Sequence, residues 1–245
     1  MIPTLRPLAL GFSLLLLTLA SCGPQADNEE PAGRQGSIPE PGPAHPPSAA
    51  APRWSTDDVV AVDDAAAQIA GAVVALPPDL RNGATVLGYD AEGTLVPLRA
   101  GANGLVCLAD TPGDDAFRVA CYSEALEPYM ARGRELRAEG LESDENFARR
   151  HAEIDAGTLA MPPEPTMVYN FGGPADLVDP ATGSVDESRG RRVYAVYTPY
   201  ATAASTGLSE TPLGPGAPWI MRPGTPTAHI MIVPPAPEPE SGGGD

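Results

Sequence analysis

The sequence predicts an α+β domain built on a small mixed, mostly antiparallel sheet with two to three helices on one side. Three observations lead to this class. A hairpin pattern comes early, two helical stretches fill the middle, and two of the clearest strand patterns come late. Because strands and helices are grouped along the chain instead of alternating regularly, the order is typical of α+β domains.

The first expected element is a helix that begins near Ser55. The Ser55 hydroxyl can cap the first turn, and Asp57 and Asp58 supply the negative charge that a helix start favours. Apolar residues then recur at helical spacing until Pro77 and Pro78 end the segment; they are Val59, Val62, Ala66, Ile69 and Val73.

A β-hairpin is expected next, with strands over 84–89 and 94–99 and a turn at 90–93. Pro97 lacks a backbone donor, so its strand belongs at a sheet edge. The later expected elements are strands at 105–108, 117–122, 166–171, 192–198 and 228–233, and helices at 123–138 and 142–155.

Two flanking segments have a different composition from the expected domain. Residues 22–53 and 234–245 are rich in Pro, Gly, Ala or Glu and poor in large apolar side chains. Such segments bury too little apolar surface to offset the entropy of ordering. We therefore expect a single globular domain at 54–233 between a disordered tether and a disordered tail.

Residues 1–21 have the features of an export signal, with Arg6 before an apolar run and small residues at its end. That run is shorter than the roughly 20 residues of a membrane-spanning helix. The sequence Leu19-Ala20-Ser21-Cys22 resembles the lipobox of bacterial lipoproteins. This resemblance implies cleavage before Cys22 and attachment of diacylglyceryl and palmitate-type chains to its thiol.

The same resemblance implies an extracytoplasmic protein of the cell envelope, held to a membrane by its lipid. Gly23 follows the lipidated cysteine where an Asp would favour retention at the inner membrane. In a Gram-negative cell this favours the outer membrane, with the domain in the periplasm.

The charge of the chain restricts its partners. It carries 32 acidic residues against 15 basic ones, a formal net charge of −17. Nucleic acid and the anionic surface of a bilayer would repel such a chain. We therefore expect membrane contact through the lipid anchor and, as a further partner, an envelope protein or a glycan. The sequence holds no phosphate-binding loop or serine-nucleophile motif, so no cofactor is expected apart from the lipid.

Two cysteines remain once Cys22 is assigned to lipid. Cys107 and Cys121 form an even pair in a chain destined for an oxidising compartment, which predicts a disulfide. A closed loop of about 15 residues would stabilise the fold by about 3 kcal/mol. The alternative is a reactive or metal-binding thiol pair, although the spacing is far from Cys-x-x-Cys.

His229 is the main candidate for a catalytic residue in the sequence. On the predicted strand it shares a face with Met231 and Val233, where an imidazole could act as general base or metal ligand. The alternative is a buried histidine satisfied by a backbone carbonyl. His151 and Asp155 lie four residues apart on one expected helix face and could hold one side of a metal, or form a solvated charged face.

Three aspartates surround a glycine in the way that oxygen ligands do in calcium loops. They are Asp176, Asp179 and Asp186, with Gly183 between them. The spacing is not that of an EF-hand, and acid-rich turns are common in their own right. Calcium is thus an alternative ligand, and no other metal is expected.

Several aromatic residues lie near the carboxyl end of the domain. Tyr194, Tyr197, Tyr200 and Trp219 could form a patch for sugar or peptide. On a straight strand, however, Tyr194 and Tyr197 point to opposite faces. The proline-rich loop at 212–226 is stiff and exposed enough to serve as a contact surface.

A set of spaced residues resembles a group of uncharacterised bacterial exported proteins. The pattern includes Gly101, Asn103-Gly104 and Cys107, together with Gly224-Thr225-Pro226 and His229-Ile230-Met231. This resemblance implies that the region is a genuine domain, and it implies no activity.

These observations predict a lipid-anchored cell-envelope protein that acts as a non-catalytic binding or accessory module. One alternative is an envelope hydrolase acting on glycan or peptide through His229 and carboxylates. A second alternative is a calcium-stabilised extracytoplasmic module. A deep pocket with His229 beside a carboxylate would favour the hydrolase, whereas an apolar or aromatic patch near Trp219 would favour the binding module.

Overall fold

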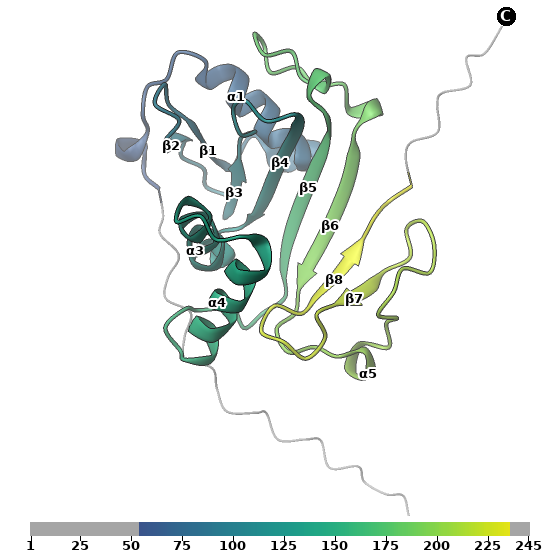
Figure 1. Ribbon diagram of the computed structural model, residues 1–245. Coiled ribbons are helices and arrows are strands. Elements are labelled where there is room, and N and C mark those ends of the chain that lie inside the picture. Colours follow the sequence, from purple (N-terminus) through teal and green to yellow (C-terminus); the bar gives the residue numbers. More distant parts are fainter. Residues whose placement is uncertain (1–53, 236–245) are drawn as a thin grey trace, which may run out of the picture. The chain divides into compact units, whose positions relative to one another are not determined.

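The computed structural model describes residues 54–235, and these residues are organised around one eight-stranded sheet (Figure 1). The strand order is β2-β1-β3-β4-β5-β6-β8-β7. The strands are β1 (Thr85–Tyr89), β2 (Leu95–Arg99), β3 (Leu105–Leu108), β4 (Ala116–Ser123), β5 (Thr166–Pro174), β6 (Arg191–Tyr197), β7 (Trp219–Met221) and β8 (His229–Ile232). Only β1 and β3 pair in parallel, so the predicted mostly antiparallel α+β class is confirmed.

The helices between these strands are mostly short. The α-helices are α1 (Ala65–Ala72), α2 (Pro78–Arg81), α3 (Glu127–Ala138), α4 (Ser143–Asp155) and α5 (Ala203–Thr206). Single 3-10 turns are η1 (Thr56–Asp58), η2 (Val73–Ala75), η3 (Glu124–Leu126), η4 (Ala175–Leu177) and η5 (Glu187–Arg189). No helix in the part of the chain that the structure describes has the length and apolar character needed to cross a bilayer.

The first predicted helix begins later than the sequence suggested. Ser55 and Asp58 do bond to each other, with the Ser55 backbone amide 2.6 Å from the Asp58 carboxylate, but they close only the single turn η1. The backbone amide of Val60 then donates to the carbonyl of Pro97 at 2.8 Å. The chain therefore runs beside β2 before it turns into α1 at Ala65.

The sheet is apolar on both faces, and helices cover both. Neighbouring β4 residues show the alternation, because Cys121 lies in the cluster with η2 residues such as Val74, and Tyr122 lies in the cluster with Leu126 and Tyr129. The first face is called the α1 face and the second the α3 face. The expectation of helices on one side of the sheet is thus wrong for α1. Successive side chains of β1 point to opposite faces and are buried on both, so each face needs a covering layer.

The two cysteines lie directly opposite each other on neighbouring strands. Cys107 of β3 and Cys121 of β4 are register partners, and their sulfur atoms are joined at 2.05 Å. Both side chains are fully buried on the α1 face. The disulfide therefore links two strands inside the core, next to the unusual parallel pairing of β1 with β3.

A buried polar network attaches α3 to the sheet. The Tyr122 hydroxyl donates to one Glu127 carboxylate oxygen at 2.5 Å, and Arg134 donates to the other at 2.5 Å and to the Tyr122 oxygen at 3.0 Å. Glu127 is only 2% exposed. Burial raises the pKa of Tyr122, so its phenol stays protonated and remains a donor. The three groups satisfy one another in a place where an unpaired charge would be costly.

This network predicts a marked loss of stability on replacement of Glu127. A Glu127→Ala variant leaves Arg134 and the Tyr122 hydroxyl without their acceptor, and we expect a loss of about 3–5 kcal/mol in the free energy of unfolding. Tyr122→Phe keeps the ring and removes two hydrogen bonds to charged groups, one with Glu127 and one with Arg134, each of which contributes about 1.5–3 kcal/mol. Urea titration followed by circular dichroism measures both.

Glu135→Ala is the matched control, because Glu135 pairs with Arg132 on the exposed side of the same helix. An exposed pair contributes about 0–1 kcal/mol. Equal losses from Glu127→Ala and Glu135→Ala would contradict the proposed importance of the buried network.

Candidate functional site

His229 lies at the start of β8, 9% exposed, on the α3 face of the sheet. Its Nδ1 is 2.8 Å from the carbonyl oxygen of Thr227, and since a carbonyl only accepts, Nδ1 carries the hydrogen. The imidazole stacks on the Tyr197 ring, with centroids 5.1 Å apart. This is the arrangement of a buried histidine satisfied by a backbone carbonyl, the alternative that the sequence left open.

His151, on α4, points to the same loop. Its Nε2 lies 2.5 Å from the hydroxyl oxygen of Thr227, which is fully buried. Burial, and then the positive charge of Arg222, lower the pKa of His151. The negative charge of Asp155 acts in the opposite direction but is the smaller effect. Because Thr227 is shielded from solvent, its contact with His151 fastens the loop before β8 to α4 and offers no accessible nucleophile.

Within residues 54–235, no group of three or more His, Cys, Asp or Glu side chains is placed to hold a metal ion. The three aspartates of the calcium pattern are each engaged separately. Asp176 pairs with Arg189 at 2.7 Å, Asp179 accepts from the amide of Ala181 at 2.9 Å, and Asp186 accepts from the hydroxyl of Ser188 at 2.6 Å. These bonds shape the turn between β5 and β6.

Two arginines that the sequence analysis did not single out lie beside the histidines. Arg150 of α4 stacks 4.0 Å from the Tyr129 ring centroid, and Arg222, after β7, stacks 3.6 Å from that of Phe147. Arg150 also lies 4.9 Å from the Phe147 ring. We call Tyr129, Phe147, Arg150, Tyr197 and Arg222 the aromatic–cation cluster. Its members come from α3, α4, β6 and a loop, so no local sequence pattern predicts the cluster.

The loop that carries Arg222 is held in a constrained shape. Arg222 has a φ of 53°, in the left-handed region that side chains other than glycine rarely adopt. Its carbonyl accepts from the hydroxyl of Thr225 at 2.8 Å, and Gly224 donates to Ala201 at 2.7 Å. Tyr200, on the facing segment, has a φ of 62°. Strained backbone of this kind is often retained at functional positions.

The α3 face is only partly covered by its helices. The register places Tyr122, Val168 and Ala195 in one row across β4, β5 and β6, and this row packs against α3. Nearer the start of β4, Ala120 lies opposite Asn170, which lies opposite Val193. In Figure 1 α3 and α4 lie over the lower part of the sheet, and the upper parts of β5 and β6 carry no helix in front.

This uncovered part of the sheet contains two adjoining recesses. One, of about 530 Å³, is floored by β4, β5 and β6, and the other, of about 950 Å³, lies beside β6, β8 and β7. Arg191 and Val193 line both. We call this surface the open sheet face and define it by Arg118, Ala120, Asn170, Gly172, Arg191, Val193, Trp219 and Met231.

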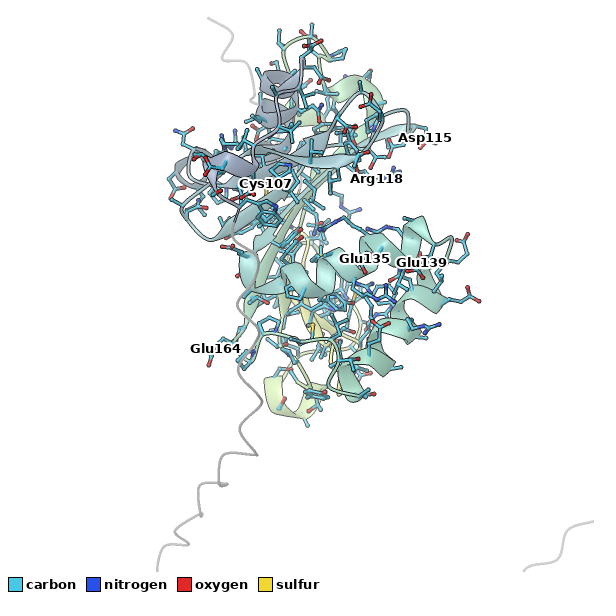
Figure 2. The ribbon with its side chains drawn as sticks, turned by 90° about the vertical axis from the view of Figure 1, so that its left-hand side faces the viewer. Cys107, Asp115, Arg118, Glu135, Glu139 and Glu164 are labelled. Carbon is cyan, nitrogen blue, oxygen red and sulfur yellow. A yellow bond between two sulfur atoms is a disulfide. The ribbon has the colours of Figure 1, made fainter. Side chains whose placement is uncertain are left out.

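Charged side chains border the open sheet face. Arg118 and Arg191 lie on either side of Gly172 in one row across the strands. Arg118 pairs with Asp114 at 3.1 Å, and Figure 2 shows it beside Asp115, above the helix of Glu135 and Glu139 in that view. Arg191 is exposed and forms no ion pair within residues 54–235, whereas its neighbours Arg189 and Arg192 are paired with Asp176 and Glu187.

The aromatic residues considered from the sequence do not form one patch. Tyr194 packs edge-on against Tyr169 at 5.7 Å, on the α1 face, and Tyr197 packs against Tyr129 and His229 on the α3 face. Trp219 lines the larger recess. The strand geometry thus separates Tyr194 from Tyr197, as expected, and leaves Trp219 as the aromatic side chain of the open sheet face.

Comparison with known proteins found no family model, no curated protein and no solved structure that matches this chain. The assignment of function therefore depends on the geometry described above. Cys22, the lipobox and the expected tether lie outside the described residues, as does the expected tail apart from Pro234 and Pro235, which line the larger recess.

The two histidines predict that stability falls on mild acidification. Burial is the first cause that lowers the pKa of both His151 and His229, and Arg222 also lowers both. Below the ordinary histidine pKa of about 6.5, the unfolded chain binds protons that the folded chain resists. We therefore expect the free energy of unfolding to decrease as the pH falls from 7.5 towards about 5.5, above the range where most carboxylates titrate.

Urea unfolding at several pH values measures this slope. His151→Gln and His229→Gln should each flatten it, and His45→Gln, which lies outside the described domain, is the matched control. A slope unchanged in both domain variants, or flattened equally by His45→Gln, would show that these imidazoles do not carry the effect.

Proposed function

We propose that this chain is a lipid-anchored binding module of the bacterial cell envelope, and that it binds an extended peptide segment of an envelope protein on the open sheet face. The observation that carries the proposal is the recess of about 950 Å³ that brings Trp219 and the unpaired Arg191 together. Trp and Arg are the side chains that most often dominate binding at protein interfaces.

The chemistry of the face favours peptide over glycan. Its floor is made largely of small and apolar side chains from neighbouring strands, including Ala120, Val193 and Met231. Proline residues line the recess beside Trp219. Grooves lined by aromatic side chains such as Trp219 accept extended, proline-rich peptides. Arg191 adds one unpaired positive charge, which suits a carboxylate of the bound segment.

The surroundings of His229 support a binding role over the hydrolase alternative. A hydrolase of the kind considered would need His229 beside a carboxylate in an open cleft. Within the described residues its contacts are the Thr227 carbonyl and the Tyr197 ring, and it is 9% exposed. Calcium remains an alternative that receives no specific support, because the three aspartates bond to neighbouring groups.

The binding proposal predicts that Trp219 and Arg191 determine affinity for acidic, proline-containing peptides. A fluorescently labelled library of such decapeptides would be titrated against the purified chain by fluorescence anisotropy. We expect Trp219→Ala to weaken the tightest peptide by about 2 kcal/mol or more, as for a hot-spot side chain. Arg191→Gln should weaken it less, and more so at low salt than at high salt.

Arg149→Gln is the matched control, because Arg149 is exposed on α4 and lies outside the open sheet face. If soluble peptidoglycan fragments bind through Trp219 and no peptide does, the peptide assignment is wrong. If neither substitution changes the binding of any probe, the open sheet face is not the binding site.

The anchoring part of the proposal is tested separately at Cys22. Cells that express the chain would be labelled with radioactive palmitate and then fractionated into soluble and membrane material. We expect label on the chain and recovery with membranes, and we expect both to be lost in Cys22→Ser, because stable anchoring depends on attached acyl chains. Unlabelled chain, or a Cys22→Ser variant that still fractionates with membranes, would contradict lipid anchoring.

A further inference from the structure

The aromatic–cation cluster contains a buried positive charge without a negative partner. Arg150 is 6% exposed, and within residues 54–235 its one hydrogen bond runs from Nη1 to the carbonyl of Tyr129 at 3.3 Å. Its Nε is buried and has no hydrogen-bond partner within the described residues. Two partly buried arginines of α3 differ, since Arg134 pairs with Glu127 and Arg132 with Glu153. A buried guanidinium stays charged and favours a nearby anion.

A second unpaired guanidinium lies beside it. Arg222 stacks on the Phe147 ring that Arg150 also approaches, and it forms no ion pair within residues 54–235. The Tyr129 ring packs against the Tyr197 ring with centroids 5.9 Å apart, and Arg150 stacks on Tyr129 at 4.0 Å, so Arg150 and both phenols belong to one packed group. Of the two arginines, Arg222 is half-buried and Arg150 is buried, so solvent reaches the guanidinium of Arg222 more easily.

The neighbouring groups do not neutralise this charge. His151 and His229 are held towards their neutral forms, and Arg137 adds positive charge near Arg150. Asp155 faces His151 and Tyr200, but it makes no salt bridge with either cluster arginine. Glu153 is engaged by Arg132 at 2.9 Å. The chain has 32 acidic residues, yet within residues 54–235 no carboxylate pairs with Arg150 or Arg222, so an external anion would be the first negative partner of these charges.

The hydroxyls of the cluster are suited to the same ligand. Burial raises the pKa of Tyr129 and of Tyr197, so both phenols remain protonated donors. The Arg150 Nε is buried and lacks a hydrogen-bond partner within the described residues, whereas the buried Tyr129 hydroxyl has the Tyr197 hydroxyl as its neighbour. Donors that lack an acceptor are unfavourable unless a ligand supplies one.

We propose that the aromatic–cation cluster is a binding site for a tetrahedral oxyanion of the phosphate class, with Arg222 as the entry group and Arg150 behind it. Guanidinium groups match the oxygen atoms of phosphate in bidentate geometry. The constrained backbone at Arg222 would hold its side chain in place before the ligand arrives. The residues of this site are separate from those of the open sheet face, so the inference goes beyond the proposed function and either can fail alone.

The experiment measures binding of inorganic phosphate to the purified chain by isothermal titration calorimetry, with chloride at the same ionic strength as the reference. We expect Arg222→Gln to weaken phosphate binding at least about tenfold, which corresponds to about 1.4 kcal/mol. Arg222→Lys should retain part of the affinity because it keeps the charge. Phosphate at about 10 mM should also raise the melting temperature of the natural chain, because it binds only the folded state.

Arg149→Gln is again the matched control, since it removes the same charge from the exposed side of α4, one residue from Arg150. Circular dichroism verifies that each variant is folded. An equal loss of phosphate binding in Arg149→Gln and Arg222→Gln would overturn the site.

A final comparison distinguishes a free phosphate from a phospholipid headgroup. The Cys22→Ser chain would be sedimented with vesicles of phosphatidylglycerol or, as reference, phosphatidylcholine. Arg222-dependent binding to phosphatidylglycerol vesicles supports the site with a lipid phosphate as its source. Phosphate binding without vesicle binding supports the site with a soluble phosphate as its ligand. A chain that binds neither phosphate nor the vesicles contradicts the proposal.

Discussion

The attachment of α3 to the sheet is the constraint on which the rest of the structure depends. Glu127 enters the interior at the start of α3 and is satisfied there by the Tyr122 hydroxyl and by Arg134. Since a buried carboxylate cannot remain unpaired, this network determines where along the sheet the helix begins. The position of α3 determines that of α4, which is joined to it through Arg132 and Glu153. A shift of α3 along β4 would break the network and expose Leu126 and Tyr129.

Partial cover by α3 and α4 produces two different environments on one sheet face. Under the helices, aromatic rings, arginines and histidines are packed together and shielded from water, so charge and hydrogen-bonding capacity have large effects there. Beyond the helices, the same strands present small side chains and recesses bordered by Arg118, Arg191 and Trp219. The open sheet face has the properties of a surface that recognises a partner through shape and aromatic packing. The packed region under the helices has the properties of a site for a small charged ligand.

Local patterns in the sequence accounted for much of the secondary structure. The hairpin of β1 and β2 and the edge position of Pro97 follow from turn chemistry and a missing backbone donor, which act within a few positions. The first helix was predicted too early, because the capping pair Ser55 and Asp58 closes only one turn while Val60 bonds to Pro97. The three-residue strand β7 lies in a proline-rich loop and depends on its partner β8 for pairing.

The sequence alone determined the class of fold, the cysteines available for a disulfide and the large excess of negative charge, because composition, periodicity and turn residues reveal these locally. Only the tertiary structure decided that α1 and α3 cover opposite faces, that His229 bonds to Thr227 and that Arg150 lies near Arg222. Arg150 and Arg222 are far apart in the chain and come together through packing around Phe147. Proximity of that kind follows from strand order and helix placement, which no spacing within a single segment encodes.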